Sequence, residues 1–202
     1  LIVSNNFISN TSPIKATAFY LDRNIFSNTY SSNTEAYISV GGGLINHNGS
    51  KTWLMDGVPY LLLHDLLIQA DNNSDNLAVL RIEEGVIVML NNGIEIVINN
   101  PNNNAFKGAL QADGVTFTRG IDNKEGLWPG ISFKNHTVDD SSFIKNCIIE
   151  YAIDGVHLSD ASPTITNNIF RYNEDGIENN GSSQPLISGN SFISNQSPVK
   201  AH

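Results

Sequence analysis

Four acidic residues in the C-terminal half are spaced closely enough to meet on one surface: Glu150, Glu174, Asp175 and Glu178. Paired carboxyl groups on either side of a glycosidic bond are the machinery of glycoside hydrolysis. However, an acidic chain exposes many carboxylates by chance, and Arg171 is the only nearby cation that could bind a sugar acid. We therefore expect these residues to be surface acids.

Metal sites are a second chemistry that the residue types allow. The segment 71–76 offers oxygen ligands at alternating positions from Asp71, Asn73 and Asp75, which suits calcium, although a solvated turn explains it more simply. The five histidines, at positions 47, 64, 136, 157 and 202, have no paired spacing on one strand. The sequence therefore predicts no cofactor and no transition-metal site, with calcium as the weaker alternative.

Tyr151, Asp154 and His157 form the best acid–base candidate. The segment resembles the Tyr, Asp and His set of β-helix alginate lyases and C5-epimerases, which implies a tyrosine and a histidine acting as general acid and base beside a carboxylate. That family has Pro-His directly after Asp, whereas Gly155-Val156 intervene here, so His157 should point away from Asp154 if the strand alternates. Asp154-Gly155 also recurs as Asp175-Gly176, which indicates a corner. We expect no catalytic role for the three residues.

Two surface features point to sugars. The aromatic residues could form a platform for a surface polysaccharide: Trp53, Trp128, Tyr20, Tyr30, Tyr60 and Tyr172. Six asparagines match the N-glycosylation acceptor pattern, which an Asn- and Ser-rich chain also produces by chance: Asn10, Asn48, Asn72, Asn135, Asn180 and Asn195.

Composition limits the classes of function. The 202 residues have a formal net charge of −9, which argues against nucleic acid as a partner because a basic surface is missing. The most apolar run, from Val58 to Ile68, is interrupted by Pro59, His64 and Asp65, so we expect no membrane insertion. A single cysteine, Cys147, excludes an internal disulfide framework. Asn makes up about one residue in seven, which predicts frequent turns.

Short repeats explain this composition. Units beginning near Asn146, Asn167 and Gly189 share one pattern with offsets of about 21 residues, and two N-terminal units near Asn5 and Arg23 are about 18 apart. Each unit contains short Ile-, Val- and Phe-rich strands between Asn, Asp, Gly or Ser-Pro corners. The pattern predicts an all-β, right-handed parallel β-helix with rungs of about 18–24 residues.

Three structural expectations follow from equivalent positions in these units. Asparagines should stack into ladders, in two sets: Asn168, Asn190 and Asn5, and Asn173, Asn195, Asn10 and Asn28. Cys147 should occupy the ladder position of Asn168. Apolar neighbours should both point into the core, as in Phe7-Ile8, Ile25-Phe26, Ile169-Phe170 and Phe192-Ile193.

The middle of the chain has longer apolar strands, as in Tyr60-Leu61-Leu62 followed by Asp65-Leu66-Leu67-Ile68, and Leu80-Arg81-Ile82 followed by Gly85-Val86-Ile87-Val88. Segments 108–118 and 126–133 continue the pattern. From about residue 53 to residue 200 the sequence resembles secreted or cell-surface right-handed parallel β-helix proteins of bacteria and archaea. This resemblance implies the fold and an extracellular location, but one fold serves many functions.

A longer repeat lies on top of the short one. Residues 186–201 copy residues 1–16 at an offset of about 185, and eleven of the sixteen aligned residues are identical. We therefore expect residues 1–50 to continue a preceding repeat or subunit and residues 51–202 to form the main body. The whole would be one unit of a larger repeat of about 185 residues.

This repeat predicts a structural role in a fibre, sheath, stalk or adhesin, with a polysaccharide-active or polysaccharide-binding β-helix as the alternative. The partners would be copies of the chain stacked head to tail, or flanking repeats of the same chain. Its expected interface residues are Ile2, Phe7, Ile8, Phe26, Phe192, Ile193 and Val199.

Overall fold

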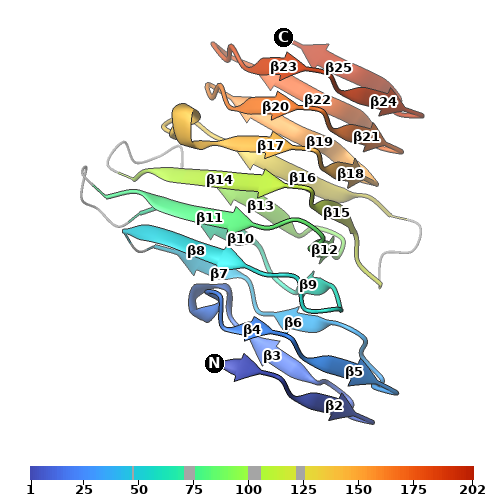
Figure 1. Ribbon diagram of the computed structural model, residues 1–202. Coiled ribbons are helices and arrows are strands. Elements are labelled where there is room, and N and C mark those ends of the chain that lie inside the picture. The colour runs from blue at the N-terminus through green and yellow to red at the C-terminus, as the bar shows by residue number, and fades with distance from the viewer. Residues whose placement is uncertain (47, 71–75, 100–105, 122–125) are drawn as a thin grey trace.

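The computed structural model describes residues 1–46, 48–70, 76–99, 106–121 and 126–202. In this part of the chain, short strands stack into three long sheets that run along one axis, with the N-terminus at one end and the C-terminus at the other (Figure 1). Every paired strand is parallel to its neighbour. The predicted all-β, right-handed parallel β-helix is confirmed.

Three sheets form the sides of the solenoid. The eight-stranded sheet contains β24 (Ser191–Ile193), β21 (Ile169–Arg171), β18 (Ile148–Glu150), β15 (Thr116–Arg119), β12 (Ile87–Leu90), β9 (Tyr60–Leu62), β6 (Ile38–Val40) and β3 (Ile14–Ala16). The seven-stranded sheet contains β25 (Ser197–Ala201), β22 (Asp175–Asn180), β19 (Ala152–Ser159), β16 (Trp128–Phe133), β13 (Glu95–Ile98), β10 (Leu66–Ile68) and β7 (Gly43–Ile45). The six-stranded sheet contains β23 (Leu186–Ser188), β20 (Thr164–Thr166), β17 (Phe143–Lys145), β14 (Gly108–Asp113), β11 (Ala78–Ile82) and β8 (Gly49–Trp53).

The remaining elements are short. At the N-terminal end, β1 (Ile2–Val3) pairs with β4 (Ile25–Phe26), and β2 (Asn6–Ile8) pairs with β5 (Thr29–Ser31). The described residues also contain two 3₁₀ helices, η1 (Ala18–Tyr20) and η2 (Asp139–Ser141). The expected boundary at residue 50 falls inside β8, which is the first strand of the six-stranded sheet. The seven-stranded sheet begins with the preceding strand, β7, and the eight-stranded sheet continues across this level from β3 and β6.

The core consists of inward side chains stacked in columns. In the seven-stranded sheet one column contains Leu66, Ile96, Ile131, Val156, Ile177 and Val199, which pair rung by rung. The members from Leu66 to Ile177 are fully buried, whereas Val199 on the last strand is 43% exposed. Each inward residue is thus covered from above and below by its neighbours in the column, and the end of the column is open.

The asparagine ladders are confirmed at both corners of the C-terminal rungs. The backbone N–H of Asn168 donates to Oδ1 of Asn190, and that of Asn173 donates to Oδ1 of Asn195. Cys147 is buried and donates its N–H to Oδ1 of Asn168, which confirms its ladder position. The residue before each ladder position has a positive φ, as at Asn167 (59°) and Ser194 (54°), which turns the chain at every corner.

The offset predicted for the N-terminal units is wrong. Asn5 pairs with Asn28 and Asn10 pairs with Asn33, so the offset is 23 residues. Ile25 accordingly lies on Ile2, not on the strand of Phe7. The dipeptide Ser-Asn occurs at both corners of both rungs, and the shorter predicted offset aligns the second corner of one rung with the first corner of the next.

The rungs are also longer in the middle than predicted. Near the C-terminus, the ladder partners Cys147 and Asn168 are 21 residues apart. In the middle of the chain, Arg81 contacts Gln111 on the next rung across 30 residues. One rung later, Thr118 contacts Glu150 across 32 residues. The additional residues lie in the chain between consecutive strands, such as β13 and β14, and β15 and β16.

The expectation that apolar neighbours both point inward is wrong as well. Phe170 is fully buried and Phe192 packs against the core, but Ile193 is 46% exposed and Ile8 is 61% exposed. Successive side chains of a strand point to opposite faces, so only one of each pair can reach the core.

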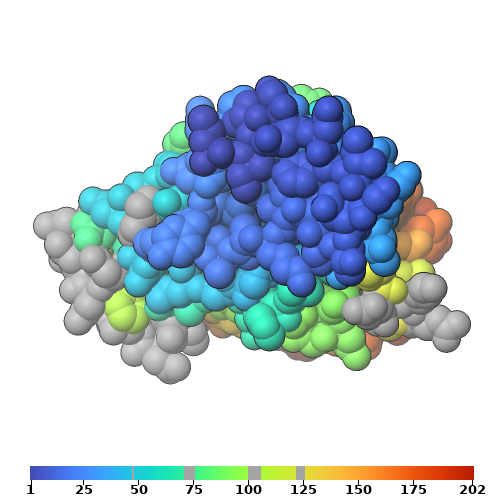
Figure 2. All heavy atoms as spheres, turned by 90° about the horizontal axis from the view of Figure 1, so that it is seen from below, coloured from blue at the N-terminus to red at the C-terminus, as the bar shows by residue number. Residues whose placement is uncertain are grey.

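The N-terminal end of the solenoid has a hollow surface. Figure 2 shows the N-terminal end, where the first residues (blue) form the surface that faces the viewer. A mainly apolar hollow of about 470 Å³ lies at this end, lined by residues that include Leu1, Ile2, Tyr20, Leu21 and Ile25.

Candidate functional site

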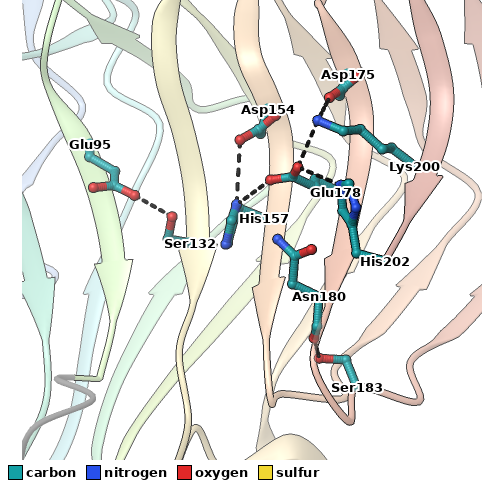
Figure 3. A network of polar contacts seen from close by, with 10 residues as sticks. All are labelled: Glu95, Ser132, Asp154, His157, Asp175, Glu178, Asn180, Ser183, Lys200 and His202. Carbon is teal, nitrogen blue, oxygen red and sulfur yellow. Dashed lines mark hydrogen bonds and ion pairs between the residues drawn. The ribbon is translucent and has the colours of Figure 1, made fainter.

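A stripe of polar and charged side chains crosses the outer face of the seven-stranded sheet near its C-terminal end (Figure 3). The strand register explains it, because Ser132, His157, Glu178 and Lys200 are successive partners in one row. Asp154 and Asp175 are partners in a second row. We call the following residues the charged stripe: Glu95, Ser132, Asp154, His157, Asp175, Glu178, Lys200 and His202.

A β-bulge brings Asp154 and His157 to the same face. Gly130 pairs with Asp154, but the next residue, Ile131, pairs with Val156, so Gly155 is an extra residue in β19. The prediction that strand alternation separates His157 from Asp154 is therefore wrong. Asp154-Gly155 is not a corner either, because both residues lie within β19.

Glycine is required at the bulge. A Cβ atom on Gly155 would lie 2.6 Å from the carbonyl oxygen of Gly176 and 3.0 Å from a ring carbon of Phe170. Gly176 has the same relation to the next rung, where a Cβ atom would lie 2.5 Å from the carbonyl oxygen of Pro198. The repeated Asp-Gly pair thus continues the bulge from β19 to β22.

Glu178 is the centre of the charged stripe. Its Oε2 atom lies 2.9 Å from Nδ1 of His157, which is 3.4 Å from Oδ2 of Asp154. Its Oε1 atom lies 2.8 Å from Nζ of Lys200 and 3.3 Å from Nε2 of His202. Lys200 also contacts Asp175 at 3.0 Å. At the other end of the stripe, the Ser132 hydroxyl donates to Glu95.

This network shifts the ionisation of two groups. The hydrogen bond from Lys200 lowers the pKa of Glu178, despite partial burial, and nearby His157 and His202 act in the same direction. Reciprocally, Glu178 and then Asp175 raise the pKa of Lys200. Glu178 and Lys200 are therefore both charged near neutral pH.

Tyr151 and Glu150 belong to a different group of contacts, at the corner before β19. The Tyr151 ring stacks on Tyr172, with centroids 5.3 Å apart, and the guanidinium of Arg119 lies 4.0 Å above it. Glu150 pairs with Arg171 at 2.6 Å. The structure thus brings Asp154 and His157 together with Asp175 and Glu178. Tyr151 and Glu150 lie outside this group.

The other predicted sites have mixed outcomes. The calcium candidates Asp71, Asn73 and Asp75, together with acceptor Asn72, lie outside the described residues. The side-chain amides of Asn10 and Asn195 already donate hydrogen bonds to backbone carbonyl groups, so a glycan there would disturb the ladder. Asn48 and Asn135 are exposed and Asn180 is half-buried. The six aromatic residues do not form one platform, because Trp53, Trp128 and Tyr60 are buried in the core.

A polar groove of about 780 Å³ lies on the outer face of the six-stranded sheet. Arg81 donates to Gln111 at 2.9 Å and Asn146 donates to Asp113 at 2.7 Å, and the ring of Phe143 lies in the lining. Polar groups beside an aromatic ring suit a carbohydrate ligand.

Four members of the charged stripe were not predicted from the sequence, namely Glu95, Ser132, Lys200 and His202. The signal was available in the short repeat. Neighbouring rungs are offset by 21 residues between Cys147 and Asn168 and by 22 residues between Asn168 and Asn190. His157, Glu178 and Lys200 follow one another at these same two offsets.

Comparison with known proteins agrees with this architecture. The model of a protein family described as "Right handed beta helix region" matches residues 111–200. Neither a curated protein nor a solved structure matches the chain. Together with the stacked parallel sheets, the family match identifies the chain as a right-handed parallel β-helix repeat protein. In the described part of the chain, no helix has the length and apolar character that a membrane crossing requires.

Proposed function

We propose that the chain is a structural repeat unit of an extracellular fibre, sheath, stalk or adhesin, in which a further rung of the same type stacks on residues 186–201. That rung comes either from the same polypeptide or from a second copy. The proposed role is structural rather than enzymatic, and the extracellular location is supported by the resemblance to secreted β-helix proteins.

The observation that supports this proposal is the contrast between Ile14 and Val199, which occupy the same position of the longer repeat. Ile14 is 5% exposed because β6 stacks on its strand, and Val199 is 43% exposed on the last strand. Burying exposed apolar surface of this kind is energetically favourable. A rung like residues 24–40 would cover Val199 as it covers Ile14 here.

The backbone conformations of the two copies also agree. Ser4 and Gly189 have φ values of 57° and 69°, and Ser9 and Ser194 have values of 55° and 54°. The N–H of Asn5 donates to Oδ1 of Asn28 on the rung above, so the N–H of Asn190 would donate to the equivalent asparagine of an added rung. Parallel stacking would also pair the exposed edges of β23, β24 and β25.

The copies lie in different sheets, which has a consequence for a continued stack. β3 belongs to the eight-stranded sheet and β25 to the seven-stranded sheet. In a continued stack, residues 186–201 of one unit would take the place that residues 1–16 have in the next unit. The seven-stranded sheet of one unit would then continue as the eight-stranded sheet of the next.

An extended chain tests the proposal. A copy of residues 18–40 is added after His202, because His202 aligns with Thr17. We expect a higher Tm and slower hydrogen exchange at the backbone amides of Asn190 and Asn195. The matched control has the same extension with Asp in place of the residues that copy Ile25 and Ile38. Equal exchange in both extended chains would contradict the proposal. Intact mass of the native assembly after denaturation separates a tandem polypeptide from stacked copies of 22.0 kDa.

The groove beside Phe143 supports a second candidate function, the binding of a surface polysaccharide. Phe143→Ala should weaken binding on a glycan array if the ring stacks on a sugar, whereas Ile87→Ala, on another sheet, should not. Equal binding by both variants would argue against this candidate.

A further inference from the structure

Three residues of the charged stripe could hold a metal ion together. Asp154, His157 and Glu178 each offer one ligand atom, and these three atoms all lie within 4.8 Å of one another. Donors bonded to a tetrahedral zinc ion at 2.0–2.1 Å are about 3.3 Å apart. The separations of 2.9 and 3.4 Å between Nδ1 and its two carboxylate neighbours are close to that value.

We propose that Asp154, His157 and Glu178 bind a divalent first-row transition-metal ion such as Zn²⁺. The inference goes beyond the proposed structural role and does not depend on it. An imidazole nitrogen suits zinc, copper or nickel, whereas calcium and magnesium prefer oxygen ligands throughout. Water completes the coordination of the ion.

The two oxygens of Glu178 have separate partners, which leaves one available to the ion. Lys200 and His202 contact Oε1, while Oε2 faces His157. Lys200 therefore orients the carboxylate in the manner of the outer hydrogen-bond partners that position metal ligands. Its positive charge is shared with Asp175.

Charge favours a cation at this position. Asp154, Asp175 and Glu178 bring three negative charges against the single positive charge of Lys200, so the group has a net charge of −2 when His157 is neutral. A divalent ion balances that charge and binds Nδ1, while the neutral imidazole carries its proton on Nε2. The chain as a whole also has a formal net charge of −9.

The ligands lie on rigid elements and remain open to solvent. Asp154 and His157 are on β19 and Glu178 is on β22, and the bulge at Gly155 fixes the first two on one face (Figure 3). The side chains of Asp154 and His157 are 19% and 22% exposed, so an ion can enter without a change of the backbone.

Titration calorimetry with Zn²⁺ alone, on protein without a histidine tag and freed of metal by a chelator, tests the site. We expect one ion per chain, and a loss of affinity of about tenfold or more in His157→Gln and in Asp154→Asn. The matched control is His64→Gln, at an exposed histidine between β9 and β10 that lies outside the charged stripe. Its affinity should equal that of the wild type.

The absorption spectrum of bound Co²⁺ provides a second readout. A ligand-field band in the visible range that disappears in His157→Gln and persists in His64→Gln supports the site. Equal Zn²⁺ affinity in the wild type and His157→Gln would overturn the proposal, as would the absence of stoichiometric binding. Unchanged circular dichroism of the variants shows that any loss of affinity is local. Either result leaves the stacking proposal intact.

Discussion

Asn168 donates both its backbone N–H and its side-chain amide to Oδ1 of Asn190, at 2.8 and 3.0 Å. The same side chain also donates to the carbonyl oxygen of Ile144 and accepts from the N–H of Cys147. One buried asparagine thus links three rungs at a corner. Buried polar groups without partners are costly, so the ladder is a major source of stability.

Asn168→Ala should destabilise the fold strongly. The change leaves the carbonyl oxygen of Ile144 and the N–H of Cys147 without these partners, at about 1–3 kcal/mol for each buried group. For a chain of this size, Tm falls by about 2–4 °C per kcal/mol. Asn135→Ala, at an exposed position, is the control for calorimetry. Similar Tm values for the two variants would show that the ladder adds little.

Gly155→Ala should disrupt the bulge. Its new methyl group would lie 2.6 Å from a backbone oxygen of the next rung, which forces a displacement and costs about 1–3 kcal/mol. Gly41→Ala is the matched control, because its Cβ would have its nearest contact at 3.6 Å. Urea midpoints check the difference, and a Gly155 variant as stable as the Gly41 variant would contradict the assigned bulge.

Phe170 and Phe192 should respond differently to truncation. Their rings stack 5.2 Å apart, but Phe170 is fully buried and Phe192 is half-buried on the last rung. Phe170→Ala should cost about 3–5 kcal/mol and Phe192→Ala less. In the chain extended by a copy of residues 18–40, the cost at Phe192 should approach that at Phe170. Equal costs in the original chain would mean that the last rung is already covered.

Cys147 should make stability fall at alkaline pH. Burial raises the pKa of its thiol to about 12, from an ordinary value of 9.0. The buried, protonated thiol therefore makes its full contribution to the free energy of unfolding below pH 9. This contribution is lost as pH rises towards 12, because the thiol of the unfolded chain releases its proton first. Urea midpoints between pH 8 and 10 should therefore decline more steeply in the wild type than in Cys147→Ala.

Thiol labelling checks the burial of Cys147 directly. A buried, protonated thiol reacts slowly with disulfide reagents. We expect labelling of the native protein to be limited by unfolding and labelling in urea to be rapid. Rapid labelling of the native state at pH 8 would contradict the buried ladder position.

The sequence by itself determined the class of fold and the asparagine ladders of the last rungs. The last rungs are offset by 21 or 22 residues with asparagine at each corner, as between Cys147, Asn168 and Asn190. That regularity is sufficient because stacked rungs repeat the same contacts with their neighbours. The sequence also placed Cys147 in the ladder and related Ile14 to Val199 through the longer repeat. These features depend on periodicity along the chain, which the sequence states directly.

Only the tertiary structure decided which residues meet. The corners Ser4-Asn5 and Ser9-Asn10 have the same sequence, so residue spacing alone could not choose between the two possible alignments of the first rungs. The bulge at Gly155 shifts the alternation of β19 by one residue, which aims His157 at Glu178 and Asp154. Local sequence does not fix such a shift. The contacts that leave no room for a Cβ atom at Gly155 come from Gly176 and Phe170 on the next rung, which only the tertiary structure brings there.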